Sequence, residues 1–404
     1  MKRRDLLQGL ALAGAGVIGS PIANVAAAGT AAARQSCATG SLGLIIERAS
    51  GSVLIVDSIT RTTLARIDGL GDLSHASAVF SRDERFAFVF GRDGGLTKID
   101  LIEQRVAKRI IQAGNAIGGA ISDDGSLVAV SNYEPGGVRV FHADTLEPLC
   151  EIAALSAGKK SKTVGLVDAP GRRFVYTLYD AGEIWIADFS KGDGVAPQVI
   201  RFEGVGKLPY DASITSDGRH YIAGLFGEDG LIQLDMWDAD AKPQRILQGY
   251  GRGEAPLPVY KMPHLEGWAA LGDRFVLPAV GRHELLAIDT RDFKELGRVT
   301  THGQPIFAVA QPGSPRVWVN FAHPLTATVQ VVDARTLSVI HTFKPGPAVL
   351  HMEFTPRGHE VWISVRDADR IDIHDTRTFA KIAELPAAKP SGIFFTARAH
   401  RIGQ

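Results

Sequence analysis

The chain has 404 residues, in which 44 Lys and Arg balance 44 Asp and Glu, so its bulk charge favours neither a nucleic-acid backbone nor an acidic membrane surface as a partner. Apolar residues make up 45% of the chain and charged residues 22%. This composition supports a large buried core and excludes a disordered or collagen-like protein.

The N-terminus has the pattern of an export signal. Basic residues at positions 2–4 precede an uncharged apolar stretch over residues 10–20, and small residues at 26–28 offer a cleavage site. The apolar stretch is too short to cross a hydrocarbon core of about 30 Å, which argues against an integral membrane segment. Because the basic cluster is similar to a twin-arginine export signal, we expect a cleaved signal peptide (1–28), an N-terminal extension (29–41) and a periplasmic protein.

Two cysteines, Cys37 and Cys150, follow the signal peptide. They could form one disulfide or none, and their spacing does not suit a cysteine-rich metal site. The chain has no Cys-x-x-Cys-His motif, which covalent attachment of haem c requires. We therefore expect no covalent haem c.

One sequence pattern, consisting of apolar strands separated by Gly or Asp turns, recurs eight times. Its third strand ends in Ile-Asp or an equivalent pair, and successive ends lie 41 to 54 residues apart, the length of four short strands with their turns. The ends are Asp57, Asp100, His142, Asp188, Asp235, Asp289, Asp333 and His374. An alternating segment such as 338–343 follows each end and fits a half-exposed fourth strand. The sequence therefore predicts an all-β protein, an eight-bladed β-propeller.

The two ends of the repeat array complement each other. Residues 42–69 supply only three strands, whereas a surplus first strand, Gly392 to Thr396, follows the eighth repeat. Strands from both termini would complete blade 1 and remove the sheet edges that otherwise promote aggregation. We therefore expect a single propeller domain over residues 42–404, closed by N- and C-terminal strands.

Histidines gather in segments that this topology places on one face of the propeller. The connections that enter the first strand of each blade and the turns between second and third strands surround the central channel on the same side. The histidines in these segments are His75, His264, His302, His351, His283 and His323. A lone loop histidine is usually a hydrogen-bonded surface residue, but several that converge on one cavity favour a metal or cofactor site. Two others, His142 and His374, hold the position of the repeated Asp.

Basic residues recur on the same face. They are Arg92, Lys159, Lys160, Lys162, Arg252 and Lys389. Any one of them could be an ordinary solvated loop charge, yet a ring of cations over a channel in an otherwise neutral protein suits a ligand with several carboxylates. Aromatic residues near the same connections, such as Tyr210 and Trp268, could shield an apolar macrocycle, although most are expected to pack within the blades.

Four short motifs resemble one blade of the haem d1 domain of cytochrome cd1 nitrite reductase. They are His75-Ala76-Ser77, Arg85-Phe86, Gly91-Arg92-Asp93-Gly94 and Ile99-Asp100-Leu101. The last residues, 396–403, are similar to the ending of a family of periplasmic haem d1 biosynthesis proteins. The resemblance extends along nearly all of the chain after the signal peptide, and it implies the same eight-bladed fold.

The resemblance also implies roles for particular residues. His75 matches the proximal iron ligand of the reductase, and Arg92 matches an arginine that faces the haem carboxylates. His264 matches the first of two distal histidines, and His302 takes the place of the second by position only. Ala78 stands where the family has an arginine, which, with the missing haem c motif, puts nitrite reduction in doubt.

The expected function follows from these assignments. We expect the protein to bind haem d1 or a late tetrapyrrole precursor non-covalently at the channel mouth and to act in a late maturation step such as dehydrogenation. His264 is the first candidate for a general base and His302 the second, with an external electron acceptor. Expected partners are nitrite reductase and other haem d1 maturation proteins. The alternatives are a non-catalytic carrier that delivers haem d1 to nitrite reductase, and a lactonase-like propeller that has no haem affinity.

Overall fold

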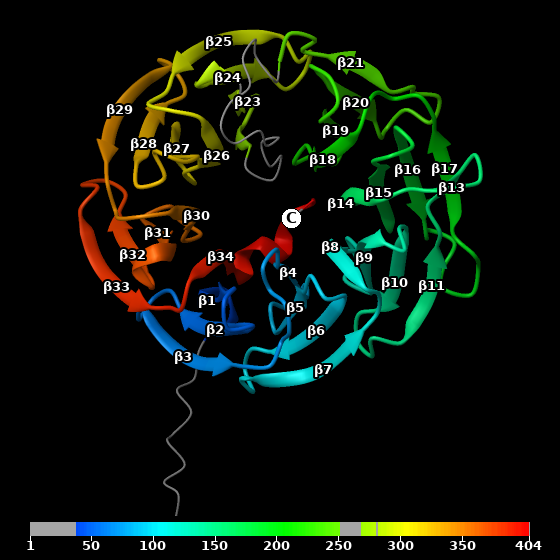
Figure 1. Ribbon diagram of the computed structural model, residues 1–404, viewed down its shortest axis with the longest axis horizontal. Helices are drawn as coiled ribbons and strands as arrows, with labels where there is room; N and C mark the ends of the chain where they lie inside the picture. The colour runs from blue at the N-terminus through cyan, green and yellow to red at the C-terminus, as the bar shows by residue number, and fades with distance from the viewer. Residues whose placement is uncertain (1–37, 251–267, 280–281, 404) are drawn as a thin grey trace, which may run out of the picture. The chain divides into compact units, whose positions relative to one another are not determined.

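The computed structural model describes residues 38–250, 268–279 and 282–403. The chain divides into two units, Met1–Ser36 and Cys37–Gln404, and all described residues belong to the second. Their strands form eight four-stranded antiparallel sheets arranged as blades in a ring (Figure 1). The predicted all-β, eight-bladed propeller is therefore confirmed. No helix among the described residues is long and apolar enough to span a bilayer.

Each blade runs from an inner strand at the channel to an outer strand at the rim (Figure 1). In that order, blades 1 and 2 consist of β34 (Pro390–Phe395), β1 (Leu42–Glu47), β2 (Ser52–Asp57) and β3 (Thr62–Ile67), then β4 (Ser77–Phe80), β5 (Phe86–Phe90), β6 (Gly95–Asp100) and β7 (Arg105–Ile111). Blades 3 and 4 consist of β8 (Asn115–Ile121), β9 (Leu127–Glu134), β10 (Val138–His142) and β11 (Pro148–Ile152), then β14 (Thr163–Ala169), β15 (Arg173–Leu178), β16 (Glu183–Asp188) and β17 (Gln198–Phe202).

The second half of the ring repeats this order. Blades 5 and 6 consist of β18 (Pro209–Ile214), β19 (His220–Leu225), β20 (Leu231–Asp235) and β21 (Gln244–Ile246), then β22 (Ala269–Leu271), β23 (Arg274–Ala279), β24 (Glu284–Asp289) and β25 (Glu295–Thr300). Blades 7 and 8 consist of β26 (Pro305–Ala310), β27 (Arg316–Phe321), β28 (Val329–Asp333) and β29 (Ser338–Phe343), then β30 (Val349–Phe354), β31 (Glu360–Val365), β32 (Arg370–Asp375) and β33 (Lys381–Pro386). The other elements within the described residues are the β12–β13 hairpin (Leu155–Ser156, Lys159–Lys160) and the 3-10 turns η1 (Thr39–Ser41), η4 (Arg366–Ala368) and η5 (Thr396–His400).

The burial of each strand follows its place in the blade. β2 and β6 are buried along their whole length because neighbouring blades cover both of their faces. The outer strand β29 alternates between exposed and half-buried residues, as expected for a fourth strand. Trp318 lies in an apolar layer between blades 7 and 8, and Trp362 in one between blades 8 and 1. The core is therefore a series of layers between blades, which fixes the direction in which the loops of each blade project.

In every blade except blade 3, which has His142 at this position, the repeated Asp closes the turn that follows the third strand. Asp57 Oδ1 accepts a hydrogen bond from the Ile59 amide at 2.7 Å, and the equivalent Asp residues in other blades do the same. In blade 8 the residue in this position is Asp375, which accepts from the Thr378 amide at 2.7 Å. The prediction that His374 holds the repeat position is therefore wrong by one residue, and its side chain is buried instead.

Blade 1 closes the ring in the predicted way. Its strand order is β3-β2-β1-β34, with Gly43 of β1 paired with Phe395 of β34. A Cβ at position 43 would lie 2.6 Å from the Phe395 ring, so glycine allows the two strands to meet. The surplus strand spans Pro390–Phe395, two residues earlier at its start than the sequence pattern predicts.

The residues after β34, which we call the tail (396–403), cross the channel, and Figure 1 shows the C-terminus at the centre of the ring. Their contacts are an Arg398–Glu353 ion pair at 2.6 Å, a His400–Glu84 contact at 2.9 Å and a hydrogen bond from the Gly403 amide to Asp168 at 2.8 Å. These partners belong to blades 8, 2 and 4 and lie at or near the ends of first strands. We call this side the lower face, and the side of the connections that enter the blades the upper face. The tail therefore covers the channel on the lower face.

Candidate functional site

The upper face carries every predicted site residue that the structure describes. The connections that enter blades 2, 4, 7 and 1 hold His75, Lys159 with Lys160, His302 and Lys389, and the second turn of blade 2 holds Arg92. His264 and Arg252 lie outside the described residues. His351, expected in a connection, lies within strand β30 instead, where its Nδ1 accepts the Ile393 amide at 3.2 Å.

His75 and Arg92 both lie next to Asp72, which brings them close to each other. The Arg92 amide donates to the Asp72 carbonyl at 2.7 Å. The Ser74 amide donates a hydrogen bond to Asp72 Oδ1 at 2.9 Å. This bond and one from the Ser74 side chain lower the pKa of Asp72, and the nearby charges of Arg92 and His75 lower it further. His75 is exposed at the surface of this turn. The structure thus brings together the predicted iron ligand and the predicted carboxylate partner.

The Arg92 guanidinium lies at the edge of a group of half-buried aromatic side chains. It lies over the ring of Tyr133, 5.2 Å from the centroid, and forms no ion pair within the described part of the chain. The Tyr133 hydroxyl lies 2.8 Å from the Tyr210 hydroxyl, and burial, together with this hydrogen bond, raises the pKa of Tyr133. The Tyr210 ring in turn contacts Tyr179 at 5.8 Å and Phe226 at 5.9 Å.

We call Tyr133, Tyr179, Tyr210 and Phe226 the aromatic arc, because they connect blades 3, 4 and 5 along the upper face. Of these four residues, only Tyr210 was expected near the site from the sequence. The other three lie at or just after the end of a second strand, so a comparison of that repeat position across blades would have found them. Each side chain is half-buried, which leaves an aromatic surface beside Arg92 that a flat apolar ligand could cover.

Lysines extend the positive charge beyond the arc. Lys160 and Lys162 line a shallow groove of about 580 Å³ together with Tyr133. The Lys162 ammonium lies over the Tyr179 ring at 5.3 Å and 3.8 Å from Asp180, so part of its charge is compensated. Lys159 and Lys160 are exposed on the β12–β13 hairpin. Lys160 is therefore the lysine that adjoins the Arg92 region most directly.

Two predicted residues are placed differently. His302 belongs to blade 7, three blades from blade 2 around the ring, and its ring contacts Phe321 at 6.0 Å. The Lys389 ammonium lies 3.8 Å from Asp369 and 3.9 Å from Asp367, which leaves it less charge to offer a ligand. The structure thus joins His75, Arg92 and Lys160 into one region, while His302 and Lys389 stand apart from it.

Two buried polar atoms on the inner strands of blades 2 and 3 have no partner among the described residues. Ser77 Oγ on β4 and Asn115 Oδ1 on β8 form no hydrogen bond in the described part of the chain. A buried polar atom left unpaired costs about 1 to 3 kcal/mol of stability. An imidazole, a guanidinium, lysines and aromatic faces are the groups that a carboxylated metallo-tetrapyrrole would need.

Fold and site together define the class: an eight-bladed propeller whose channel face combines an accessible histidine with cations and aromatic rings. A sequence model of the "Cytochrome D1 heme domain" matches residues 37–399. The chain is 58% identical to "Protein NirF" of Pseudomonas aeruginosa over 368 residues, 90% of this chain and 93% of that protein. It is 54% identical to "Protein NirF" of Stutzerimonas stutzeri over 378 residues, 93% of this chain and 96% of that protein.

A solved structure agrees with these sequence matches. The dihydro-heme d1 dehydrogenase NirN in complex with DHE superposes with a TM-score of 0.80 at 27% identity, covering 91% of this chain and 78% of that chain. The chain therefore belongs to the cytochrome D1 haem domain family and, within it, to the NirF proteins. This is the family that the blade motifs and the C-terminal residues indicate.

Proposed function

We propose that the protein binds haem d1 or a late tetrapyrrole precursor non-covalently on the upper face and acts in a late step of haem d1 biosynthesis in the periplasm. The observation that supports this most strongly is the adjacency of His75 and Arg92, next to the aromatic arc, in a member of the haem d1 domain family. The similarity to a dehydrogenase solved with DHE points to the same class of ligand.

Each part of the region has a distinct role in this proposal. A haem d1-type ligand would supply the iron and the carboxylates. His75 would hold the iron through a ring nitrogen, because its side chain is exposed on this face. Arg92 offers paired donors to one carboxylate, and Lys160 with Lys159 reaches a second. The aromatic arc covers one apolar edge and excludes water from it.

We further propose that the maturation step is a dehydrogenation of the bound precursor. Removing two hydrogen atoms from adjacent carbons releases two electrons and two protons, so an external electron acceptor, such as a partner protein with haem c, must take the electrons. His302 is the described candidate for the base that accepts a proton, on the side of the channel across from His75. Nitrite reductase and other haem d1 maturation proteins are the proposed partners.

Titration of the mature full-length protein with haem d1 and with its dihydro precursor tests the proposal. We expect one ligand per chain by absorbance, and Arg92→Ala weakens binding by about 1 to 3 kcal/mol because a charge-assisted hydrogen bond is lost. The control Arg357→Ala removes an exposed arginine in a lower-face turn and leaves affinity unchanged. If neither ligand changes the absorbance, the proposed function is rejected.

Mass spectrometry of the bound ligand separates the enzyme from the carrier. Loss of two hydrogens from the precursor in the presence of an electron acceptor supports the dehydrogenase. Transfer of haem d1 to nitrite reductase at unchanged ligand mass supports the non-catalytic carrier.

A further inference from the structure

A cavity lies on the lower face, away from His75 and Arg92. Its volume is about 850 Å³, and turns and strands of blades 5 to 8 form its walls. The tail forms the remaining side, held in place by the Arg398–Glu353 ion pair and by the Gly403–Asp168 hydrogen bond. Pockets that enclose small organic ligands commonly have volumes in this range. We call it the tail-face cavity.

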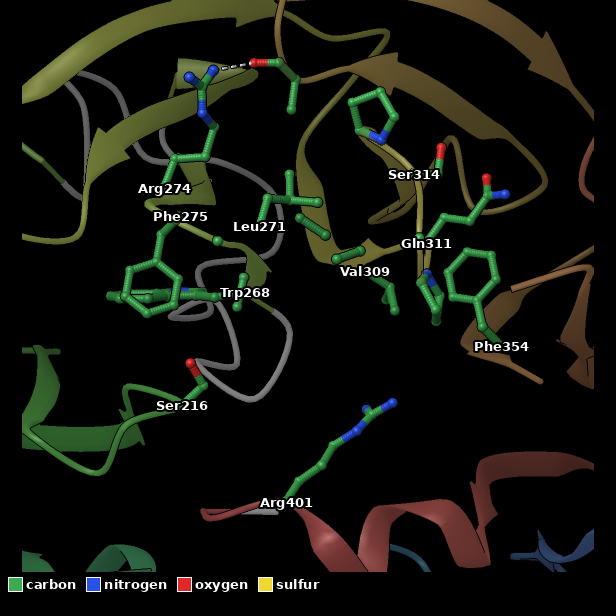
Figure 2. Close-up of a pocket in the computed structure, with 18 of the residues that line it drawn as sticks. Ser216, Trp268, Leu271, Arg274, Phe275, Val309, Gln311, Ser314, Phe354 and Arg401 are labelled. Atoms are coloured by element: carbon green, nitrogen blue, oxygen red, sulfur yellow. Dashed lines mark hydrogen bonds between the residues drawn. The ribbon is translucent and has the colours of Figure 1, made fainter. Parts of the chain in front are cut away.

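One wall of the tail-face cavity is aromatic and apolar. Trp268 and Phe275 of blade 6 form an edge-to-face pair with ring centroids 5.8 Å apart, and Leu271 lies beside them (Figure 2). Val309 and Phe354, from blades 7 and 8, stand on the opposite side (Figure 2). Such walls favour the apolar body of a ligand, because contact with it removes both surfaces from water.

Basic residues line this space, among them Arg274, Arg335, Arg398 and Arg401. Figure 2 shows the Arg401 side chain extending from the tail into the cavity, with no hydrogen bond to the residues drawn. Arg401 is exposed, and the protein atoms around its guanidinium lower its pKa by partial desolvation. Glu353 is the acidic group nearby, but both of its oxygens already bind Arg398, at 2.6 and 3.2 Å. By contrast, the Arg274 guanidinium in the same wall is engaged with the Ala334 carbonyl at 2.8 Å.

One buried polar group in the wall, the Trp268 indole N–H, is unsatisfied in the part of the chain that the structure describes. The Trp268 side chain is only 7% exposed, and its indole N–H has no hydrogen-bond partner within the described residues. A buried N–H donor normally has an acceptor in the protein or in an ordered water. The cavity itself offers the Arg401 guanidinium beside an apolar wall.

We propose that the tail-face cavity binds an amphipathic organic acid, with its carboxylate on the Arg401 guanidinium and its aromatic or aliphatic body against Trp268, Phe275 and Leu271. A carboxylate supplies the acceptors that a guanidinium binds in pairs, and it neutralises the charge of Arg401. A neutral ligand of the same shape offers no carboxylate for the paired guanidinium donors and does not neutralise the charge of Arg401. This site is separate from the upper face, so the proposal does not depend on haem d1 binding.

Fluorescence titration with dansylglycine, an aromatic carboxylate, tests the proposal on the mature full-length protein, with dansylamide as the uncharged analogue. We expect one saturable dansylglycine site per chain and at least fivefold weaker binding of dansylamide. Arg401→Gln weakens dansylglycine binding at least fivefold and leaves dansylamide binding unchanged. Arg357→Gln, an exposed lower-face arginine outside the cavity, changes neither.

Two further variants complete the test. Arg401→Lys keeps the charge but loses the paired donors, so its dansylglycine affinity should fall between those of the wild type and Arg401→Gln. His75→Ala, on the upper face, should leave dansylglycine affinity unchanged. Equal dansylglycine affinity in the wild type and Arg401→Gln, at unchanged circular dichroism, overturns the proposal. So does the absence of saturable binding, or a loss of binding in His75→Ala.

Discussion

Asp168 gives the fold a pH dependence that can be calculated from its surroundings. Its carboxyl is 1% exposed, accepts the Gly403 amide at 2.8 Å and lies 3.5 Å from the Arg82 guanidinium. Burial outweighs both of these contacts and raises the pKa of Asp168 to about 6, from 3.8. The folded protein therefore binds a proton that the unfolded chain has already lost at pH 5. For an acid shifted in this direction, stability is present at low pH and falls as the pH rises through 6.

The size of this effect follows from the shift. About 2 pKa units correspond to about 3 kcal/mol in total, of which about 2 kcal/mol develops between pH 4 and pH 7. Asp168→Asn keeps an oxygen for the Gly403 amide and removes the titration. The free energy of unfolding of the variant, minus that of the wild type, should therefore rise by about 2 kcal/mol from pH 4 to pH 7.

Urea denaturation at several pH values measures this difference. Asp240→Asn, at an exposed carboxylate, serves as the control for the loss of one charge. A difference between Asp168→Asn and the wild type that stays constant from pH 4 to pH 7, or that falls, would refute the reasoning and with it the burial of Asp168 beneath the tail.

Three more outcomes are expected. Arg398→Met should lower the free energy of unfolding by about 3 kcal/mol, because it leaves the buried Glu353 carboxylate unpaired. The control Arg366→Met, at an exposed ion pair, should change the free energy of unfolding by less than about 0.5 kcal/mol. Equal losses for the two variants in urea denaturation would contradict this prediction. Asp375→Ala should cost about 1 kcal/mol by freeing the Thr378 amide, and a neutral result would mean that the repeated Asp does not hold its turn. Haem d1 at a hundred times its Kd should stabilise the wild type by about 2.7 kcal/mol, whereas an unchanged thermal unfolding midpoint would argue against tight binding.

The blades were predictable because their signals are local. In seven of the eight blades the third strand ends in an Asp whose side chain closes the next turn, as Asp57 does for the Ile59 amide, so the repeat carries its own boundary marker. The prediction was wrong in blade 8, where His374 and Asp375 are adjacent and either could end the third strand. Only the hydrogen bonds in the structure show that Asp375 closes the turn. Closure by β34 was predictable because the first repeat lacks one strand and the chain supplies one near its end.

The site was only partly predictable, because it depends on how neighbouring blades meet. Topology alone places His75 and Arg92 on the upper face, but only the structure shows that Asp72 lies between them. The contact of Tyr133 with Tyr210 joins residues 77 positions apart, and no periodic pattern encodes such a distance. The path of the tail depends in the same way on scattered partners.

Partners in blades 2, 4 and 8 hold the tail across the channel. A segment of eight residues that binds three separate blades leaves no periodic trace in the sequence. The tail-face cavity, which exists only because the tail crosses there, was therefore outside the reach of sequence analysis. The positions of residues that contact their own blade can be predicted from the repeat. Contacts between residues of different blades across the ring can be seen only in the structure.

The ligand-field spectrum of the iron in the haem d1 complex tests the central claim most directly. His75→Ala, with haem d1 bound, should show a spectrum altered in the way that loss of a nitrogen axial ligand produces, while Arg92→Ala at saturating haem d1 should keep the wild-type spectrum. An identical spectrum for the wild type and His75→Ala would contradict the assignment of the iron to this imidazole.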